Sequence, residues 1–153
     1  MKKLSLLLIC LTCIFSCATR TFNPNNPNVI YSVAKNYYVD RMNNQEVIYK
    51  KISSYNELIS IFGLDPKTDK NGDLSEGKPT EVDFSKNYVI GLIAPQSYKN
   101  KEIIINNIIK NNGNITINYS IKDTATPITS RFAPFKILII DRRYDGNISL
   151  NKL

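Results

Sequence analysis

The stretch Glu102-Ile-Ile-Ile-Asn-Asn-Ile-Ile-Lys-Asn-Asn-Gly-Asn-Ile-Thr-Ile-Asn-Tyr-Ser-Ile121 decides the fold. Asn112-Gly113 separates two runs rich in β-branched residues, and both residues tolerate the positive φ angles that a two-residue hairpin turn requires. Apolar and polar residues alternate in the second run, which indicates a strand with one core face and one solvent face. The stretch therefore predicts a β-hairpin. The alternating residues are Ile115, Ile117, Tyr119 and Ile121 against Thr116, Asn118 and Ser120.

Two further apolar runs lie on either side of this hairpin in the sequence. Residues 88–94 are almost continuously apolar, which is typical of a central strand buried on both faces. Residues 136–140 predict another interior strand, ended by Asp141. We expect the polar residues 123–130 to form a connection that leads toward it.

The N-terminal half adds strands and one helix. The patterns predict a strand region at 29–39 that forms a hairpin with a strand at 46–52. Ser54 is a candidate helix N-cap with Glu57 three residues on, and we expect Gly63 to end the helix. The fold class that follows is mainly β (α+β), an antiparallel sheet or small β-sandwich with one short packed helix. The apolar face of that helix comprises Tyr55, Leu58, Ile59 and Phe62.

The segment 64–81 is the longest expected loop and carries several acidic residues. Carboxylate and amide oxygens could bind Ca²⁺. However, an EF-hand alignment with Gly72 at the sixth position puts Lys67 and Lys78 at the first and twelfth positions, where acids are required. We therefore favour a solvated loop and assign no metal site. The weak candidate ligands are Asp69, Asn71, Asp73 and Glu76.

The N-terminus has the pattern of an export signal. Lys2 and Lys3 precede an uncharged, mainly apolar run at 4–15, which is shorter than the roughly 20 residues of a membrane-spanning helix. The end of this run, Ile14-Phe15-Ser16-Cys17, resembles the lipobox of bacterial lipoproteins. That resemblance implies a signal peptide at 1–16 and an acylated Cys17. A secretory signal without acylation is the alternative.

The resemblance also suggests how the rest of the chain is organised. Residues 17–28 would be the acylated cysteine and a flexible tether with Pro24 and Pro27, and residues 29–153 a single β-rich domain. Acyl chains would anchor the protein to a membrane without spanning it. Ala18, by analogy with other lipoproteins, suggests the outer membrane of a bacterial cell envelope, facing the periplasm.

The composition argues against most catalytic chemistry. The chain has no histidine and no tryptophan, and its three cysteines are Cys10, Cys13 and Cys17. A mature chain would keep only Cys17, so it could form no Ser-His-Asp triad, no His-containing zinc site and no internal disulfide. We therefore expect a protein that is not an enzyme and needs no cofactor.

The formal net charge of +7 falls to +5 once Lys2 and Lys3 leave with the signal. This charge could suit an anionic partner. We favour a simpler explanation, an AT-rich genome in which Lys, Asn, Ile and Tyr codons are abundant. No basic stripe with interleaved aromatic residues occurs, so we expect no nucleic acid partner.

The order of the expected elements resembles a known family. The order runs from a strand and a Ser-Tyr-Asn-Glu-Leu helix to Asp83-Phe84-Ser85-Lys86, and then to a hairpin and Pro134-Phe135-Lys136-Ile-Leu-Ile. It is similar to the C-terminal domain of the bacterial protease-complex protein PrcB over about residues 46–142. The Gly-Gly-Tyr turn frequent in that family is replaced here by Ala94-Pro-Gln-Ser-Tyr98. The resemblance implies an accessory, protein-binding role without catalytic residues.

These observations favour a lipid-anchored envelope protein that binds or stabilises another envelope protein, such as a protease. Tyrosine offers a large contact area at a low entropy cost, so exposed Tyr37, Tyr38 and Tyr98 would form the partner surface. The alternatives are a small-ligand or calcium-binding module that uses the 64–81 loop, and a carboxylate-based hydrolase.

Overall fold

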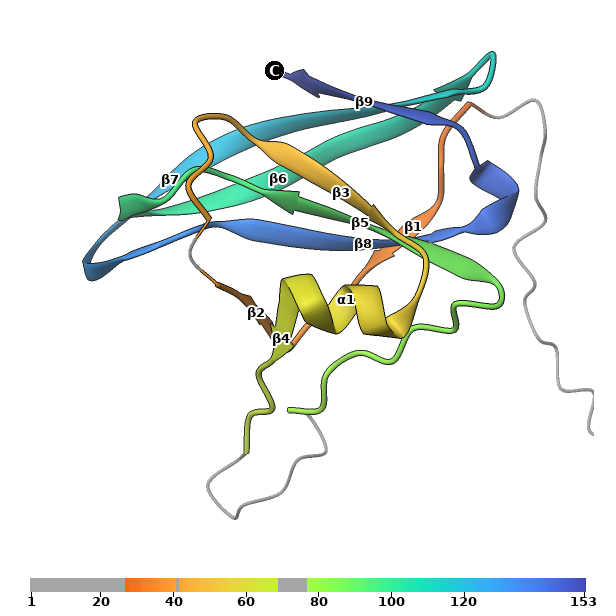
Figure 1. Cartoon of the computed structure of the whole chain (residues 1–153). Helices are drawn as coiled ribbons and strands as arrows, with labels where there is room; N and C mark the ends of the chain where they lie inside the picture. Colours follow the sequence, from red (N-terminus) through yellow and green to blue (C-terminus); the bar gives the residue numbers. More distant parts are fainter. Residues whose placement is uncertain (1–26, 41, 69–76) are drawn as a thin grey trace, which may run out of the picture.

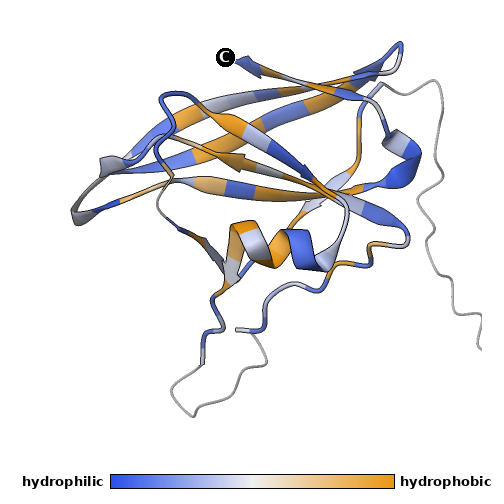
Figure 2. Cartoon of the chain, in the orientation of Figure 1, coloured by the Kyte–Doolittle hydropathy of each residue, from blue (hydrophilic) through white to orange (hydrophobic). Residues whose placement is uncertain are grey.

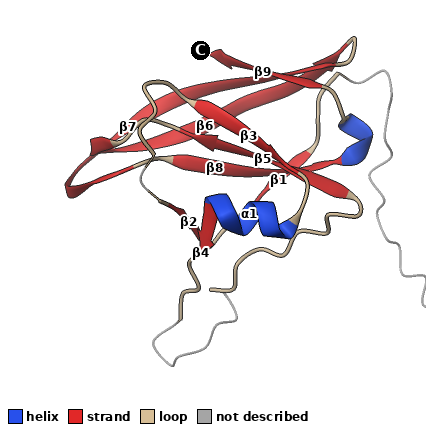
Figure 3. Ribbon diagram, viewed as in Figure 1, coloured by secondary structure: helices blue, strands red, loops and turns tan. Residues whose placement is uncertain are grey.

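The computed structural model describes residues 27–40, 42–68 and 77–153, and arranges them in three layers (Figure 1). A four-stranded sheet lies in the middle, with a three-stranded sheet on one face and a helix with a two-stranded sheet on the other (Figure 3). The elements are β1 (Tyr31–Val33), β2 (Tyr37–Val39), β3 (Ile48–Ile52), α1 (Tyr55–Ile61), β4 (Phe62–Leu64), β5 (Asn87–Ile93), β6 (Ser97–Asn111), β7 (Asn114–Phe132), β8 (Phe135–Asp141), the 3-10 turn η1 (Arg142–Tyr144) and β9 (Asn147–Lys152).

The central sheet has the order β1-β8-β5-β3, and every pair in it is antiparallel. Its strand β5 is buried on both faces from Tyr88 to Ile93. Successive side chains point to opposite faces of a strand, so one set faces the three-stranded sheet and the other faces the helix. This confirms the prediction of a doubly buried central strand. The first set includes Tyr88, Ile90 and Leu92, and the second includes Val89 and Ile93.

The predicted hairpin is formed by β6 and β7, and it covers the first face. Asn112 and Gly113 have φ angles of 47° and 77°, as a two-residue turn between strands requires. The alternation of the second run is also confirmed, because Ile115, Ile117 and Tyr119 are buried. Figure 2 shows the alternation as bands along both strands.

The second face is covered by α1 and the antiparallel pair β2 and β4. The Ser54 side chain accepts a hydrogen bond from the Glu57 N–H at 3.2 Å, as the N-cap prediction requires. Leu58 and Phe62 bury their side chains completely, whereas Tyr55 and Ile59 stay about half exposed. The apolar face of α1 is therefore narrower than its spacing predicted.

Three expectations about the N-terminal half are wrong. Residues 29–39 form two strands in different sheets, because Asn36 takes a positive φ of 62° and turns the chain between them. The strand β3 pairs with β5 and not with this region. Gly63 does not end the helix, because the chain passes directly from Ile61 into β4.

One expectation about the C-terminal half also needs correction. Residues 123–130 continue β7 and do not form a polar connection. After η1, the chain adds β9, which pairs in parallel with β7 and which the sequence patterns did not reveal. Its Ile148 and Leu150 pack against the core beneath the three-stranded sheet.

Candidate partner-binding surface

Tyr98 stands at the start of β6, where the ladder with β7 becomes irregular. Its side chain is 58% exposed, and the guanidinium carbon of Arg131, near the end of β7, lies 4.7 Å from the ring centroid. A guanidinium at this distance is attracted by the ring's electrons. The exposed Tyr98 ring therefore stacks with the positively charged Arg131 side chain. The expected exposure of Tyr98 is confirmed.

Tyr38 is the second exposed tyrosine of the expected surface, at 46%. It pairs across β2 and β4 with Gly63, and a Cβ atom added at Gly63 would overlap the tyrosine ring. Because Gly63 has no side chain, the Tyr38 ring packs directly against the Gly63 backbone. An aromatic ring covering a cross-strand glycine holds its position in a sheet.

Tyr37 does not share this surface. Its side chain is 6% exposed and its hydroxyl donates a hydrogen bond to the Thr80 carbonyl oxygen at 2.7 Å. Burial raises the pKa of the Tyr37 hydroxyl above its ordinary value, with smaller contributions from Tyr55 and Glu81. The expected exposure of Tyr37 is wrong, because the strand places its side chain in the core.

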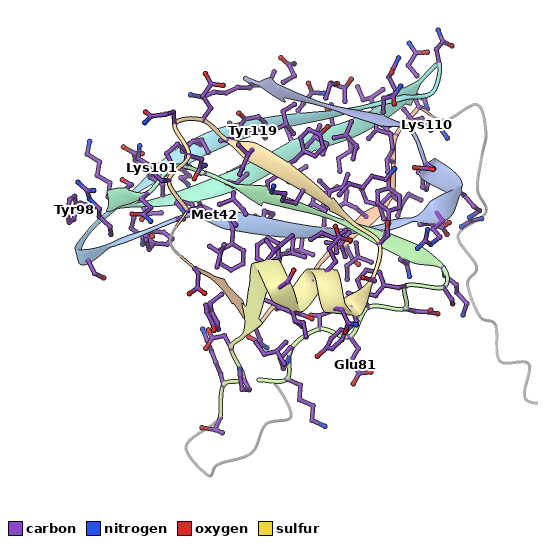
Figure 4. The ribbon with its side chains drawn as sticks, viewed as in Figure 1. Met42, Glu81, Tyr98, Lys101, Lys110 and Tyr119 are labelled. Carbon is purple, nitrogen blue, oxygen red and sulfur yellow. The ribbon has the colours of Figure 1, made fainter. Side chains whose placement is uncertain are left out.

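Two adjoining hollows bring Tyr38 and Tyr98 to one region. One has a volume of about 470 Å³ and is lined by Tyr98 and Met42, and the other has a volume of about 200 Å³ and is lined by Tyr38. Gln96 and Arg131 line both. We call this region, formed by Tyr38, Met42, Gln96, Tyr98 and Arg131, the Tyr98 surface. Figure 4 labels Met42 and Tyr98 in it.

Arg131 gives the Tyr98 surface an exposed hydrogen-bond donor. Among the described residues, no carboxylate lies within ion-pair distance of Arg131. Asn44, which lines the 470 Å³ hollow, donates through Nδ2 to the carbonyl oxygens of Glu46 and Ile93, while its buried Oδ1 has no described donor. Because this oxygen is buried, it is not exposed to a partner, and Arg131 is the group through which the Tyr98 surface offers hydrogen bonds.

Two other arginines, Arg142 and Arg143, are engaged within the fold. Arg142 donates to the carbonyl oxygens of Phe84 and Ser53, and Arg143 forms an ion pair with Asp141 at 2.7 Å. The hydrogen bond from Arg143 lowers the pKa of the Asp141 carboxyl. These side chains hold the turn η1 in place.

A larger hollow of about 780 Å³ opens beside the Tyr98 surface, between the segment that enters β3 and the end of β9. It carries Glu46 and Asp123 together with Lys101 and Lys152, so neither charge dominates. Tyr119 lies at its base, and burial, then Glu46, raises the pKa of the Tyr119 hydroxyl. A hollow with this mixed lining does not define a ligand class.

The weak metal candidates Asp69, Asn71, Asp73 and Glu76 lie outside the described residues. Within the part of the chain that the structure describes, no group of three or more Asp, Glu, His or Cys side chains could hold a metal ion. The solvated loop therefore stays a prediction, and calcium binding stays its alternative.

Comparisons with known protein families, curated proteins and solved structures find no match to this chain. The resemblance to the PrcB C-terminal domain therefore stays a prediction. None of the described helices is sufficiently long and apolar to cross a membrane. The expected signal at 1–16 and Cys17 lie outside the described residues.

Proposed function

We propose that this protein is a lipid-anchored envelope protein that binds or stabilises another envelope protein through the Tyr98 surface. One observation carries the proposal: the Tyr98 surface and the entry of the N-terminal segment lie at opposite ends of the domain. An anchor at Cys17 would then leave the surface accessible to a partner.

The entry point is defined by two hydrogen bonds to β6. The Lys110 N–H donates to the Pro27 carbonyl oxygen, and the Val29 N–H donates to the Ile108 carbonyl oxygen at 2.8 Å. Tyr98 is twelve residues from Lys110 on the same strand, which corresponds to about 40 Å. Figure 4 shows Tyr98 and Lys110 at opposite ends of the molecule.

The chemistry of the Tyr98 surface suits a protein more than a small molecule. Tyrosine and arginine are enriched among the residues that contribute most to protein–protein binding. A polypeptide also provides carboxylate and carbonyl acceptors for the Arg131 guanidinium. The two hollows of this surface are only partly enclosed, whereas small-molecule sites usually enclose most of their ligand.

The surface is tested by replacing its two exposed tyrosines. Proteins recovered with the Tyr38→Ala/Tyr98→Ala variant after crosslinking in intact cells are compared with those recovered with the unsubstituted chain. We expect the recovered amount of the main envelope partner to fall about tenfold, because removing a hot-spot side chain costs more than about 1 kcal/mol of binding free energy. Tyr49→Ala is the matched control, since Tyr49 is a similarly exposed tyrosine on β3. Equal recovery with all three chains would contradict the proposal.

The anchor is tested separately at Cys17. Changing Cys17 to Ala is expected to move the protein from the membrane fraction to the soluble fraction, because stable attachment depends on the acyl chains. Cell fractionation followed by immunoblotting measures the change, and circular dichroism of the released protein checks that it is folded. Unchanged membrane fractionation would show that Cys17 is not the anchor.

A further inference from the structure

The outer edge of β9 has no neighbouring strand among the described residues, because β9 ends the order β6-β7-β9. The Asn147 N–H donates to the Gly113 carbonyl oxygen, and the Leu153 N–H donates to the Tyr119 carbonyl oxygen. The odd-numbered residues of β9 therefore direct their backbone N–H and C=O groups toward β7. Backbone direction alternates along a strand, so the N–H and C=O groups of Ile148, Leu150 and Lys152 point outward.

Other sheet edges of the described fold are protected. The edge strand β1 has only three residues, and β3 carries adjacent Lys50 and Lys51. The edge of β6 is partly covered by residues 27–29 and is interrupted by register shifts. Short strands, lysines and bulges are the usual devices against edge-to-edge pairing. By contrast, β9 has six residues in regular pairing, without proline, and its one lysine is at its end.

The solvent face of the three-stranded sheet carries a row of polar side chains that ends at this edge. Asn118 donates to the Asn107 Oδ1 at 2.5 Å, and Asn151 donates to the Asn118 Oδ1 at 2.6 Å. Ser149 and Thr116 form a second row at 3.2 Å. No described donor reaches the Asn151 Oδ1, which leaves it available to a neighbour beyond β9.

We propose that β9 pairs antiparallel with β9 of a second copy of this chain, with Ser149 on the two-fold axis. In this register Ile148 of each copy lies opposite Leu150 of the other, and their outward backbone groups form the hydrogen bonds. Asn147 of each copy then faces Asn151 of the other and donates to its Oδ1. A two-fold interface requires such self-complementarity. In these pairs an apolar side chain lies opposite an apolar one, and an asparagine lies opposite an asparagine.

The charges at the ends of β9 complement each other in the same register. Lys152 lies opposite Gly146 of the second copy and next to its Asp145. Asp145 forms an ion pair with Lys51 of its own chain, but its side chain is 68% exposed and can also be approached by Lys152. No described carboxylate lies within ion-pair distance of Lys152. Two such contacts, related by the two-fold axis, favour a second copy over a partner of one charge.

Engineered cysteines test both the pairing and its register. Residues directly opposed without hydrogen bonds between them have Cα atoms about 4.5 Å apart, within the range of about 4.4 to 6.8 Å that a disulfide spans. The full chain with Ser149→Cys, oxidised in cell membranes, is expected to form a disulfide-linked homodimer. The unsubstituted chain measures the background from Cys10, Cys13 and Cys17.

Thr116→Cys is the matched control, because Thr116 contacts Ser149 on the same face but lies one strand further in. Its two copies would be about 14 Å apart, too far for a disulfide. We expect about tenfold more disulfide-linked dimer with Ser149→Cys than with Thr116→Cys. Asn147→Cys and Asn151→Cys should crosslink when the two chains are expressed together and not when either is expressed alone.

Two results would overturn the pairing. One is a Ser149→Cys dimer yield no higher than that of Thr116→Cys. The other is a Ser149→Cys crosslink to a different protein, which would mean that β9 pairs with a strand of another chain. Neither result bears on the Tyr98 surface, because its test uses residues outside β9.

Discussion

Phe62→Ala is expected to lower the free energy of unfolding by about 3 to 5 kcal/mol, the usual cost of truncating a fully buried phenylalanine. Phe62 is 0% exposed, and its ring centroid lies 5.6 Å from that of Phe135. Because it joins α1 to β4, the cavity would open between the helix and the central sheet. Urea unfolding followed by circular dichroism measures the change.

Leu64→Ala is the matched control for this prediction. Leu64 is an apolar residue of the same strand, but its side chain is 43% exposed. We expect it to cost less than about 1 kcal/mol, since a large part of the side chain already contacts water. Similar losses for Leu64→Ala and Phe62→Ala would contradict the assignment of Phe62 to the core.

Gly91→Ala is expected to destabilise the protein by about 1 to 3 kcal/mol through overpacking. A Cβ atom at Gly91 would lie 2.5 Å from two carbons of the Phe62 ring. Alanine in a strand is normally favoured over glycine by roughly 0.5 to 1 kcal/mol. The clash outweighs this gain because the ring is fully buried and cannot move into solvent.

A double-mutant cycle with Phe62→Leu tests the cause. If Gly91 is needed to make room for the Phe62 ring, Gly91→Ala should cost less in the Phe62→Leu background, with an interaction energy of at least about 0.5 kcal/mol. The control is Gly91→Ala measured in the Leu64→Ala background, where the Phe62 ring is unchanged and the cost of Gly91→Ala should stay the same. Strictly additive losses with Phe62→Leu would contradict this explanation.

Features determined by local chemistry were predictable from the sequence. The turn at Asn112-Gly113 depends on two residues that accept positive φ, and the burial of β5 follows from its continuous apolar run. The Ser54 N-cap likewise depends on neighbouring residues only. These features led to the correct fold class, a mainly β structure with one short helix.

Features determined by distant parts of the chain were not predictable. The partner of β3 is β5, about forty residues away, and no residue pattern in β3 selects it over β2. No turn motif in the sequence signals the pairing of β9 with β7, because the strands are parallel and β8 and η1 lie between them in the chain. The position of Arg131 over Tyr98 has the same cause, since β6 and β7 bring the two together across 33 residues.

The burial of Tyr37 shows a further limit of sequence patterns. In Tyr37-Tyr38 the two side chains point to opposite faces of β2, so only one of them can belong to the surface. The sequence does not say which face is buried, because Tyr38 could equally have faced the core. That choice depends on the pairing of Tyr38 with Gly63, a glycine that leaves room for the ring.

The central claim, that the Tyr98 surface binds another envelope protein, is tested most directly by photo-crosslinking in living cells. A photoreactive amino acid is placed at Tyr98 in one chain and, as a control, at Asn111, an exposed residue at the opposite end of β6. The account predicts one specific protein adduct from position 98 that is absent from position 111. The same adducts from both positions, or none from position 98, would contradict it.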